Sequence, residues 1–106
     1  MGCAVRARGR TDGNQAEAVK YMRALGMSVE VASNIGGGFP DLIIGFRGVT
    51  CLVELKDGSK VASARVLTKA QEEWHASWAG HRVVCETKEA AAQAVIAHAQ
   101  AAGVKV

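Results

Sequence analysis

The sequence lacks any long hydrophobic run and is poor in proline, cysteine and aromatic residues. No apolar stretch approaches the roughly 20 residues that a membrane-spanning helix needs, so we expect no membrane partner. The first ten residues carry three arginines but no apolar core, which is not the pattern of a secretory signal. We therefore expect a cytoplasmic protein.

The few cysteines and aromatic residues stand at positions that favour structural roles. Cys3, Cys51 and Cys85 show no CxxC spacing, which argues against a zinc site or a disulfide framework. Cys51 and Cys85 lie within apolar patterns typical of strands, so we expect buried thiols in a reducing compartment. Trp74 and Trp78 are four residues apart, which predicts a buried stripe on a helix rather than a platform for stacked bases.

What is present fits one globular domain. The chain has 106 residues, of which 49% are hydrophobic and 22% charged. At this length a folded domain buries roughly 65% of its unfolded surface. Residues 1–13 are rich in Gly and Arg without periodicity, which predicts a flexible basic arm before a single domain over residues 14–106. The net charge of +3 mildly favours a polyanionic partner.

Hydrophobic periodicity and capping residues predict an α/β fold with the element order α-β-β-β-α-β-α. The helix that starts at Thr68 has Gln71 at the spacing of a capping box, and we expect it to bury Ala70, Trp74 and Trp78. The third and fourth strands can join as a parallel crossover, which gives a mixed four-stranded sheet with helices on both faces. The expected elements are helices over 14–25, 68–79 and 88–102 and strands over 27–32, 41–46, 49–56 and 82–86.

The two central strands form a hairpin that carries three charged residues. If its turn is centred on Arg47-Gly48, Asp41 lies directly across from Glu54, with Cβ atoms about 5 Å apart. At an effective dielectric of about 20, two carboxylates at that separation repel by roughly 3 kcal/mol, so they favour a shared cation. Side chains alternate along a strand, so Lys56 projects to the same face as Glu54. The pattern predicts a divalent-metal site facing an anionic substrate.

Pro40-Asp41 followed thirteen residues later by Glu54-Leu55-Lys56 resembles the motif of the PD-(D/E)xK nuclease superfamily. Within it the chain is most similar to the small VRR-NUC domains of phages and bacteria, which are related to Holliday junction resolvases. Two further features agree, namely Asn34 with the Gly-rich loop before the motif and Leu67-Thr68-x-x-Gln71 after it. The resemblance covers residues 14–100 and implies a restriction-endonuclease-like core, in a bacterial or phage-infected cell.

The resemblance also implies the roles of individual residues. Asp41 and Glu54 would coordinate Mg²⁺ or Mn²⁺, the main-chain carbonyl of Leu55 would complete the set, and Lys56 would orient or activate the attacking water. Hard divalent cations take oxygen ligands and retain waters, so two carboxylates suffice when phosphate oxygens finish the coordination shell.

The sequence departs from the resolvase relatives in the first helix. Those proteins carry a metal-associated glutamate eleven residues before the glycine that follows the helix. Counting back from Gly26 reaches Gln15, whereas Glu17 is two residues later, so either residue is a candidate accessory group. Gln71 is a third, although its capping role explains it without catalysis. His75 follows one turn later, where an exposed or fully hydrogen-bonded histidine is the favoured interpretation.

Several residues are candidates for contact with a nucleic-acid backbone. The arginines and lysines among them can bind phosphates, and the glycines let main-chain amides approach closely; a solvated basic surface and a flexible turn are the respective alternatives. These candidates are Arg6, Arg8, Arg10, Gly37, Gly38, Lys60, Arg65 and Lys69.

These observations lead to a main functional hypothesis and two alternatives. The main hypothesis is a metal-dependent endonuclease that hydrolyses DNA, either selective for branched or flapped structures or non-specific. Cutting two strands would require a homodimer with two active sites. The first alternative is a catalytically silent nucleic-acid-binding module that retains the nuclease fold. The second is an enzyme of small phosphorylated molecules.

Overall fold

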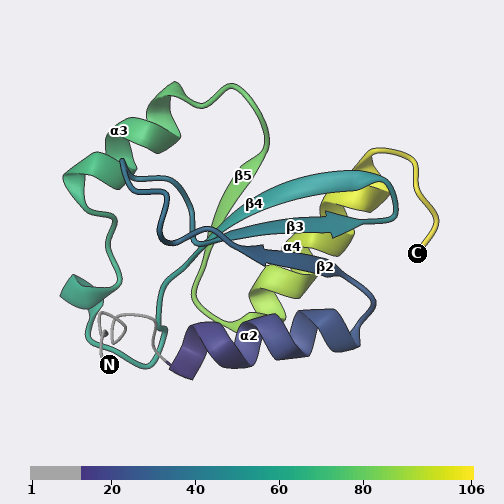
Figure 1. The fold of residues 1–106 in the computed structure, drawn as a ribbon, viewed down its shortest axis with the longest axis horizontal. Helices are drawn as coiled ribbons and strands as arrows, with labels where there is room; N and C mark the ends of the chain where they lie inside the picture. Colours follow the sequence, from purple (N-terminus) through teal and green to yellow (C-terminus); the bar gives the residue numbers. More distant parts are fainter. Residues whose placement is uncertain (1–12) are drawn as a thin grey trace.

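The computed structural model describes residues 13–106, in which four strands form one mixed sheet with helices packed around it (Figure 1). The helices are α2 (Gly13–Ala24), α3 (Lys69–Ser77) and α4 (Lys88–Ala101), with a short 3-10 helix η1 (Ala62–Ala64) before α3. The strands are β2 (Ser28–Val31), β3 (Leu42–Phe46), β4 (Val49–Leu55) and β5 (Arg82–Cys85). The predicted α/β class and element order are confirmed. Arg6, Arg8 and Arg10 of the predicted basic arm lie outside the described residues.

The hairpin of β3 and β4 has the predicted register. Phe46 pairs with Val49 and Leu42 with Val53, which centres the turn on Arg47-Gly48. Both turn residues have positive φ angles, 51° and 87°, as the type I′ turn of a two-residue hairpin requires. The sheet order is β2-β3-β4-β5, and β5 is parallel to β4, so the chain from β4 through α3 to β5 is the predicted crossover.

The hydrophobic core lies on one face of the sheet, against α2 and α4. Because side chains alternate along a strand, every second residue of β3 and β4 faces this core. The Ala-rich helix α4 presents small side chains, which lets it approach the sheet closely. The core includes Ala18 and Met22 of α2, Val29 of β2, Leu42, Ile44 and Phe46 of β3, Cys51, Val53 and Leu55 of β4, and Ala91, Val95 and Ala99 of α4.

Cys51 and Cys85 are buried and free, as predicted. Burial, followed by the nearby Cys85, raises the pKa of Cys51 to about 11, and burial also raises the pKa of Cys85. Both thiols are therefore protonated at neutral pH and act as small hydrophobic groups. Cys3 lies outside the described residues.

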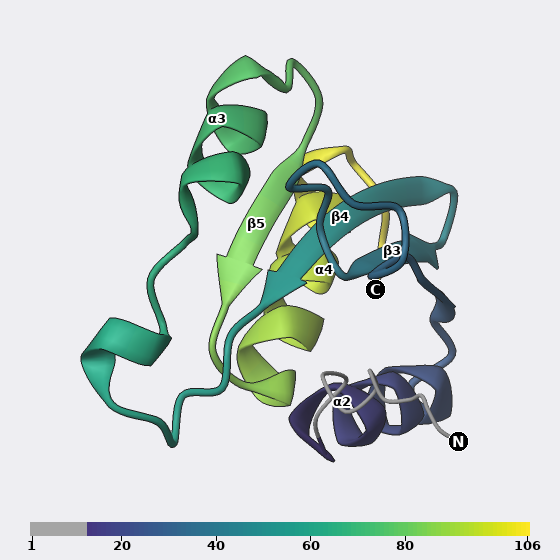
Figure 2. The same cartoon turned by 60° about the vertical axis from the view of Figure 1, so that its left-hand side comes forward.

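Helix α3 lies on the other side of the sheet from α4 (Figure 2). Hydrogen bonds connect it to side chains on the second face of the sheet. The Gln71 amide donates to Oε2 of Glu54 on β4, and the Arg82 guanidinium of β5 donates to the main-chain oxygen of His75 at 2.9 Å. Helices therefore occupy both sides of the sheet, and α3 is held partly by polar contacts.

The predicted buried face of α3 was wrong. Ala70 is exposed, Trp74 is half-buried and 41% of Trp78 is exposed, and none of the three belongs to the hydrophobic core. The reason is that α3 packs against the Gly-rich loop and polar side chains of the sheet, and the hydrophobic face of the sheet is already covered by α2 and α4. His75 is the buried residue of this helix instead.

The Gly-rich loop touches α3 at Gly38. Gly38 has a φ of +87°, and a Cβ atom added there would lie 2.3 Å from the main-chain oxygen of Ala70. Gly37 has a φ of +66°, but open space surrounds it. Gly38 is thus required for packing the loop on α3, which is a structural reason for a residue considered above as a nucleic-acid contact.

Replacing Gly38 by Ala should destabilise the protein more than the same change at Gly37. Each alanine incurs about 1–2 kcal/mol for a left-handed backbone, and only Gly38→Ala also forces the loop away from the Ala70 carbonyl. Urea denaturation of the two variants measures the difference. Equal losses of stability would show that the loop does not need this close approach.

Candidate active site

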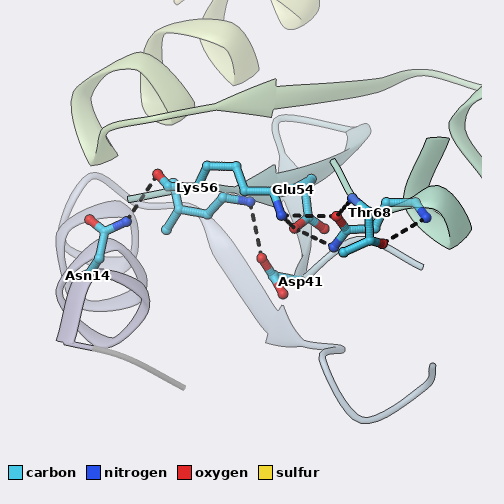
Figure 3. Close-up of polar contacts among 7 residues, drawn as sticks. Asn14, Asp41, Glu54, Lys56 and Thr68 are labelled. Atoms are coloured by element: carbon cyan, nitrogen blue, oxygen red, sulfur yellow. Dashed lines mark hydrogen bonds and ion pairs between the residues drawn. The ribbon is translucent and has the colours of Figure 1, made fainter. Parts of the chain in front are cut away.

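Two carboxyl groups meet where β3 begins and β4 ends. Asp41 immediately precedes β3, and its Oδ2 accepts a hydrogen bond from the main-chain N–H of Leu55 at 3.1 Å (Figure 3). Glu54 is the second-last residue of β4, and its exposed fraction is only 2%. The structure therefore brings Asp41 and Glu54 together on one sheet face, at the position that the hairpin register implies.

The environment of Glu54 favours its protonated form. Burial is the largest cause, the neighbouring Asp41 carboxylate adds to it, and the ammonium of Lys56 opposes both. Together these raise the pKa of Glu54 from 4.5 to about 7. Without a further cation, the pair therefore holds a proton over most of the acidic range, because two close carboxylates cannot both ionise cheaply.

Lys56 and Gln71 form a hydrogen-bonded arrangement with Glu54. Nζ of Lys56 lies 3.5 Å from Oε2 of Glu54 and donates to Oε1 of Gln71 at 2.9 Å. Nε2 of Gln71 donates to the same Glu54 oxygen at 3.0 Å. Lys56 and Glu54 are thus held in one geometry by a single amide group.

The capping box of α3 explains why Gln71 is placed so accurately. Oε1 of Gln71 accepts from the main-chain N–H of Thr68 at 2.9 Å, and the Thr68 hydroxyl accepts from the main-chain N–H of Gln71 at 3.2 Å. The capping role and the site role considered for Gln71 therefore coexist, since the same side chain makes both sets of contacts.

A polar cavity of about 320 Å³ opens beside these groups. Gln15, which is 6% exposed, lies in its wall, whereas Glu17 is exposed and lines a separate cavity of about 350 Å³. Of the two accessory candidates from α2, the structure brings only Gln15 to the carboxyl pair. The wall of the first cavity consists of Gln15, Asp41, Glu54, Leu55, Lys56, Asp57, Lys60, Ala64 and Gln71.

The residues of this cavity fit a hard divalent cation. Oε1 of Glu54 is buried and has no hydrogen-bond partner within residues 13–106, so an acceptor is available beside Asp41. No group of three or more His, Cys, Asp or Glu side chains suited to a metal occurs in that part of the chain. A cation here would therefore have two carboxylates as its acidic ligands, with neutral oxygens and waters completing the shell, as Mg²⁺ accepts.

A solved structure described as a VRR_NUC domain superposes with a TM-score of 0.56 and 27% sequence identity, covering 85% of this chain and 94% of that one. This chain has a VRR-NUC-like fold. The predicted resemblance and the restriction-endonuclease-like fold class are confirmed. No family model and no curated protein matches the sequence, and no helix of residues 13–106 has the length and hydrophobicity to span a membrane.

The basic residues proposed to bind phosphates do not all gather at the cavity beside Asp41 and Glu54. Lys60 lines the cavity. Arg65 instead forms an ion pair with Glu86 at 2.9 Å, and Lys69 lies 3.9 Å from Glu73 along α3. Arg65 and Lys69 could bind DNA phosphates only if the phosphates replaced Glu86 and Glu73 as their partners.

The sequence did not indicate the buried environment of His75. It is 8% exposed, and its Nε2 has no hydrogen-bond partner among residues 13–106, so the expectation of an exposed or fully hydrogen-bonded histidine was wrong. Burial, and then the positive charges of Arg82 and Lys56, lower its pKa, so the imidazole is neutral at neutral pH. Its position four residues after Gln71, on the same helix face, was the available signal.

The raised pKa of Glu54 should make the metal-free protein less stable as pH increases. The folded state keeps the proton up to about pH 7, whereas an unfolded chain loses it near 4.5. Between these values the folded state binds more protons, so the free energy of unfolding falls with rising pH, by on the order of 3 kcal/mol. Urea denaturation in EDTA from pH 4.5 to 8 measures this.

The control is Glu54→Gln, which removes the titrating group while keeping its shape. The lowered pKa values of His75 and His81 act in the opposite sense, so the informative quantity is the difference in stability between parent and variant. That difference should change steadily through this pH range. A constant difference would show that Glu54 titrates normally.

Proposed function

We propose that this domain is a divalent-metal-dependent nuclease that hydrolyses DNA phosphodiester bonds. The observation that carries the proposal is the buried Oε1 of Glu54, which has no hydrogen-bond partner within residues 13–106. Glu54 lies beside the Asp41 carboxylate, and the Lys56 ammonium is 3.5 Å from the other Glu54 oxygen. Anionic ligands for a cation and a fixed positive charge for a phosphate thus occur side by side. The similarity to a structure described as a VRR_NUC domain supports nuclease chemistry.

In this proposal each residue has a defined task. Mg²⁺ or Mn²⁺ would be held by Asp41, Glu54 and the main-chain carbonyl of Leu55, and Gln15 would contribute an amide at the cavity wall. The bound ion would polarise the phosphoryl group and lower the pKa of an attacking water. Lys56 orients that water and stabilises the negative charge that grows on the phosphoryl oxygens.

Gln71 acts as a positioning residue in the same scheme. Its amide fixes Lys56 and Glu54 relative to one another, so the ammonium does not collapse fully onto the carboxylate. The capping box keeps this amide in place before substrate arrives. Preorganised charges of this kind are the part of a site that contributes most to catalysis.

The proposed DNA substrate and oligomeric state follow from the same site. The polar cavity beside Asp41 and Glu54 offers few groups that could read base sequence, so we propose that the domain recognises DNA structure such as branches or flaps. Lys60 and the arginines at 6, 8 and 10 would contact the backbone. Two-strand cutting would use a homodimer, and the reduced thiols suit a cytoplasmic setting.

Cleavage assays test the proposal directly. Supercoiled, linear, single-stranded and four-way-junction DNA are incubated with Mg²⁺, Mn²⁺ or EDTA. Metal-dependent cutting that Asp41→Asn abolishes is the expected result, and cutting confined to the junction would identify a structure-selective enzyme. Binding to DNA without cutting in either metal would refute the nuclease and leave the silent binding module.

Replacing Lys56 by Ala should lower the cleavage rate at saturating DNA by roughly 10²–10³, because one stabilising contact to the developing charge is lost. Affinity for DNA should change little, since binding sums many phosphate contacts. Lys60→Ala is the matched control, because Lys60 lines the same cavity, whereas the ion pair with Glu54 is formed by Lys56. It should weaken binding while leaving the saturated rate near normal. If the two variants behave alike, Lys56 acts only in binding.

A further inference from the structure

An aromatic cluster continues the candidate site along α3. The rings of Trp74 and Trp78 are stacked, with centroids 4.8 Å apart and an interplanar angle of 19°. Phe39 of the Gly-rich loop meets both indoles edge-on, with centroids 5.2 Å from Trp74 and 6.4 Å from Trp78. Trp78 nevertheless remains 41% exposed. A large aromatic surface is thus ordered but only partly covered.

Local backbone features hold this cluster in place. Gly38 allows the loop to approach the Ala70 carbonyl, which brings Phe39 against the helix. At the other end, a Cβ atom on Gly80 would lie 2.8 Å from Nε1 of Trp78, so glycine permits the indole to lie against the chain. The rings therefore have fixed positions without being part of the hydrophobic core.

We propose that Trp78, supported by Trp74 and Phe39, stacks against an unpaired base of the DNA whose backbone enters the candidate active site. This inference rests on the proposed function and names a substrate class, namely DNA with a single-stranded segment next to the cleavage point. Base–aromatic stacking is tolerant of sequence, since every base presents a π-face.

The position of the cluster favours a base over other partners. Gln71, which contacts Glu54 and Lys56, and Trp78 are seven residues apart on α3 and its cap, which corresponds to about 10 Å along the helix axis. At the roughly 3.4 Å per nucleotide of a base-stacked strand, that is about three nucleotides, and it is fewer in an unstacked strand. The Arg82 guanidinium donates to the main-chain oxygen of His75, which places a positive charge at α3 between Gln71 and Trp78 in the sequence.

Intrinsic fluorescence gives a direct test, because Trp74 and Trp78 are the two tryptophans of the chain. The full protein is titrated in EDTA, which prevents cleavage, with a short oligothymidylate, an abasic oligonucleotide of the same length and a blunt duplex. Stacking predicts quenching by oligothymidylate and much less quenching by the other two. Equal quenching by the abasic strand would overturn the proposal, since that strand offers phosphates only.

Affinity measurements on variants complete the test, with anisotropy of a labelled oligothymidylate as the readout. Trp78→Ala should bind about five- to 150-fold more weakly, the equivalent of one lost stacked base, whereas Trp78→Phe should bind nearly as well as the parent. Leu25→Ala, which removes a side chain that is 46% exposed at the end of α2, is the matched control and should bind normally. Unchanged affinity of Trp78→Ala would refute the proposal.

Two further outcomes separate this inference from its alternatives. If sedimentation shows that Trp78→Ala converts a dimer to a monomer without changing oligonucleotide affinity, the cluster is a subunit interface and the proposal is wrong. If the protein shows base-dependent quenching but never cuts DNA with Mg²⁺ or Mn²⁺, the stacking inference stands and the proposed nuclease fails. If the protein nicks plasmid with Mg²⁺ or Mn²⁺ but shows no quenching, the proposed nuclease stands and the stacking inference is wrong.

Discussion

The proximity of two carboxyl groups at one end of the sheet is the constraint on which the site depends. Asp41 and Glu54 face each other across the hairpin, and burial makes their mutual repulsion costly. The surrounding groups reduce that cost. The Leu55 N–H donates to Asp41, while Lys56 and Gln71 approach the same oxygen of Glu54. The second Glu54 oxygen has no hydrogen-bond partner within residues 13–106. A cation bound there would reduce the remaining repulsion between the two carboxylates.

This constraint also accounts for the unusual placement of α3. The helix is not needed to cover the hydrophobic face of the sheet, because α2 and α4 already do so. Instead its capping box fixes Gln71 against Lys56 and Glu54, and Phe39 of the Gly-rich loop packs against Trp74 of the same helix. One short helix therefore links the charged cavity to an ordered aromatic surface, and the proposed path of a DNA strand follows that link.

Much of this arrangement was accessible from the sequence, for local reasons. The Arg47-Gly48 turn determines the hairpin register, and that register alone puts Asp41 across from Glu54. The Thr68 capping box likewise places Gln71 one helical turn into α3. Both predictions depend on residues close in the chain, where turn and cap geometry are nearly fixed.

Other features depend on contacts between distant segments, and there the sequence was insufficient. The spacing of Trp74 and Trp78 indicated a buried stripe, but nothing local shows that the hydrophobic face of the sheet is already occupied. The choice between Gln15 and Glu17 depends on the rotation of α2 relative to β4, which helical periodicity leaves open.

Binding of Mn²⁺ tests the central claim most directly, because it does not require a substrate. Isothermal titration at pH 8 should show a site in the parent protein that Asp41→Asn and Glu54→Gln each weaken strongly. Glu17→Gln is the control, since Glu17 lines the other cavity, and it should bind Mn²⁺ as the parent does. Undiminished binding in Asp41→Asn, or loss of binding in Glu17→Gln, would show that the carboxyl pair is not the cation site.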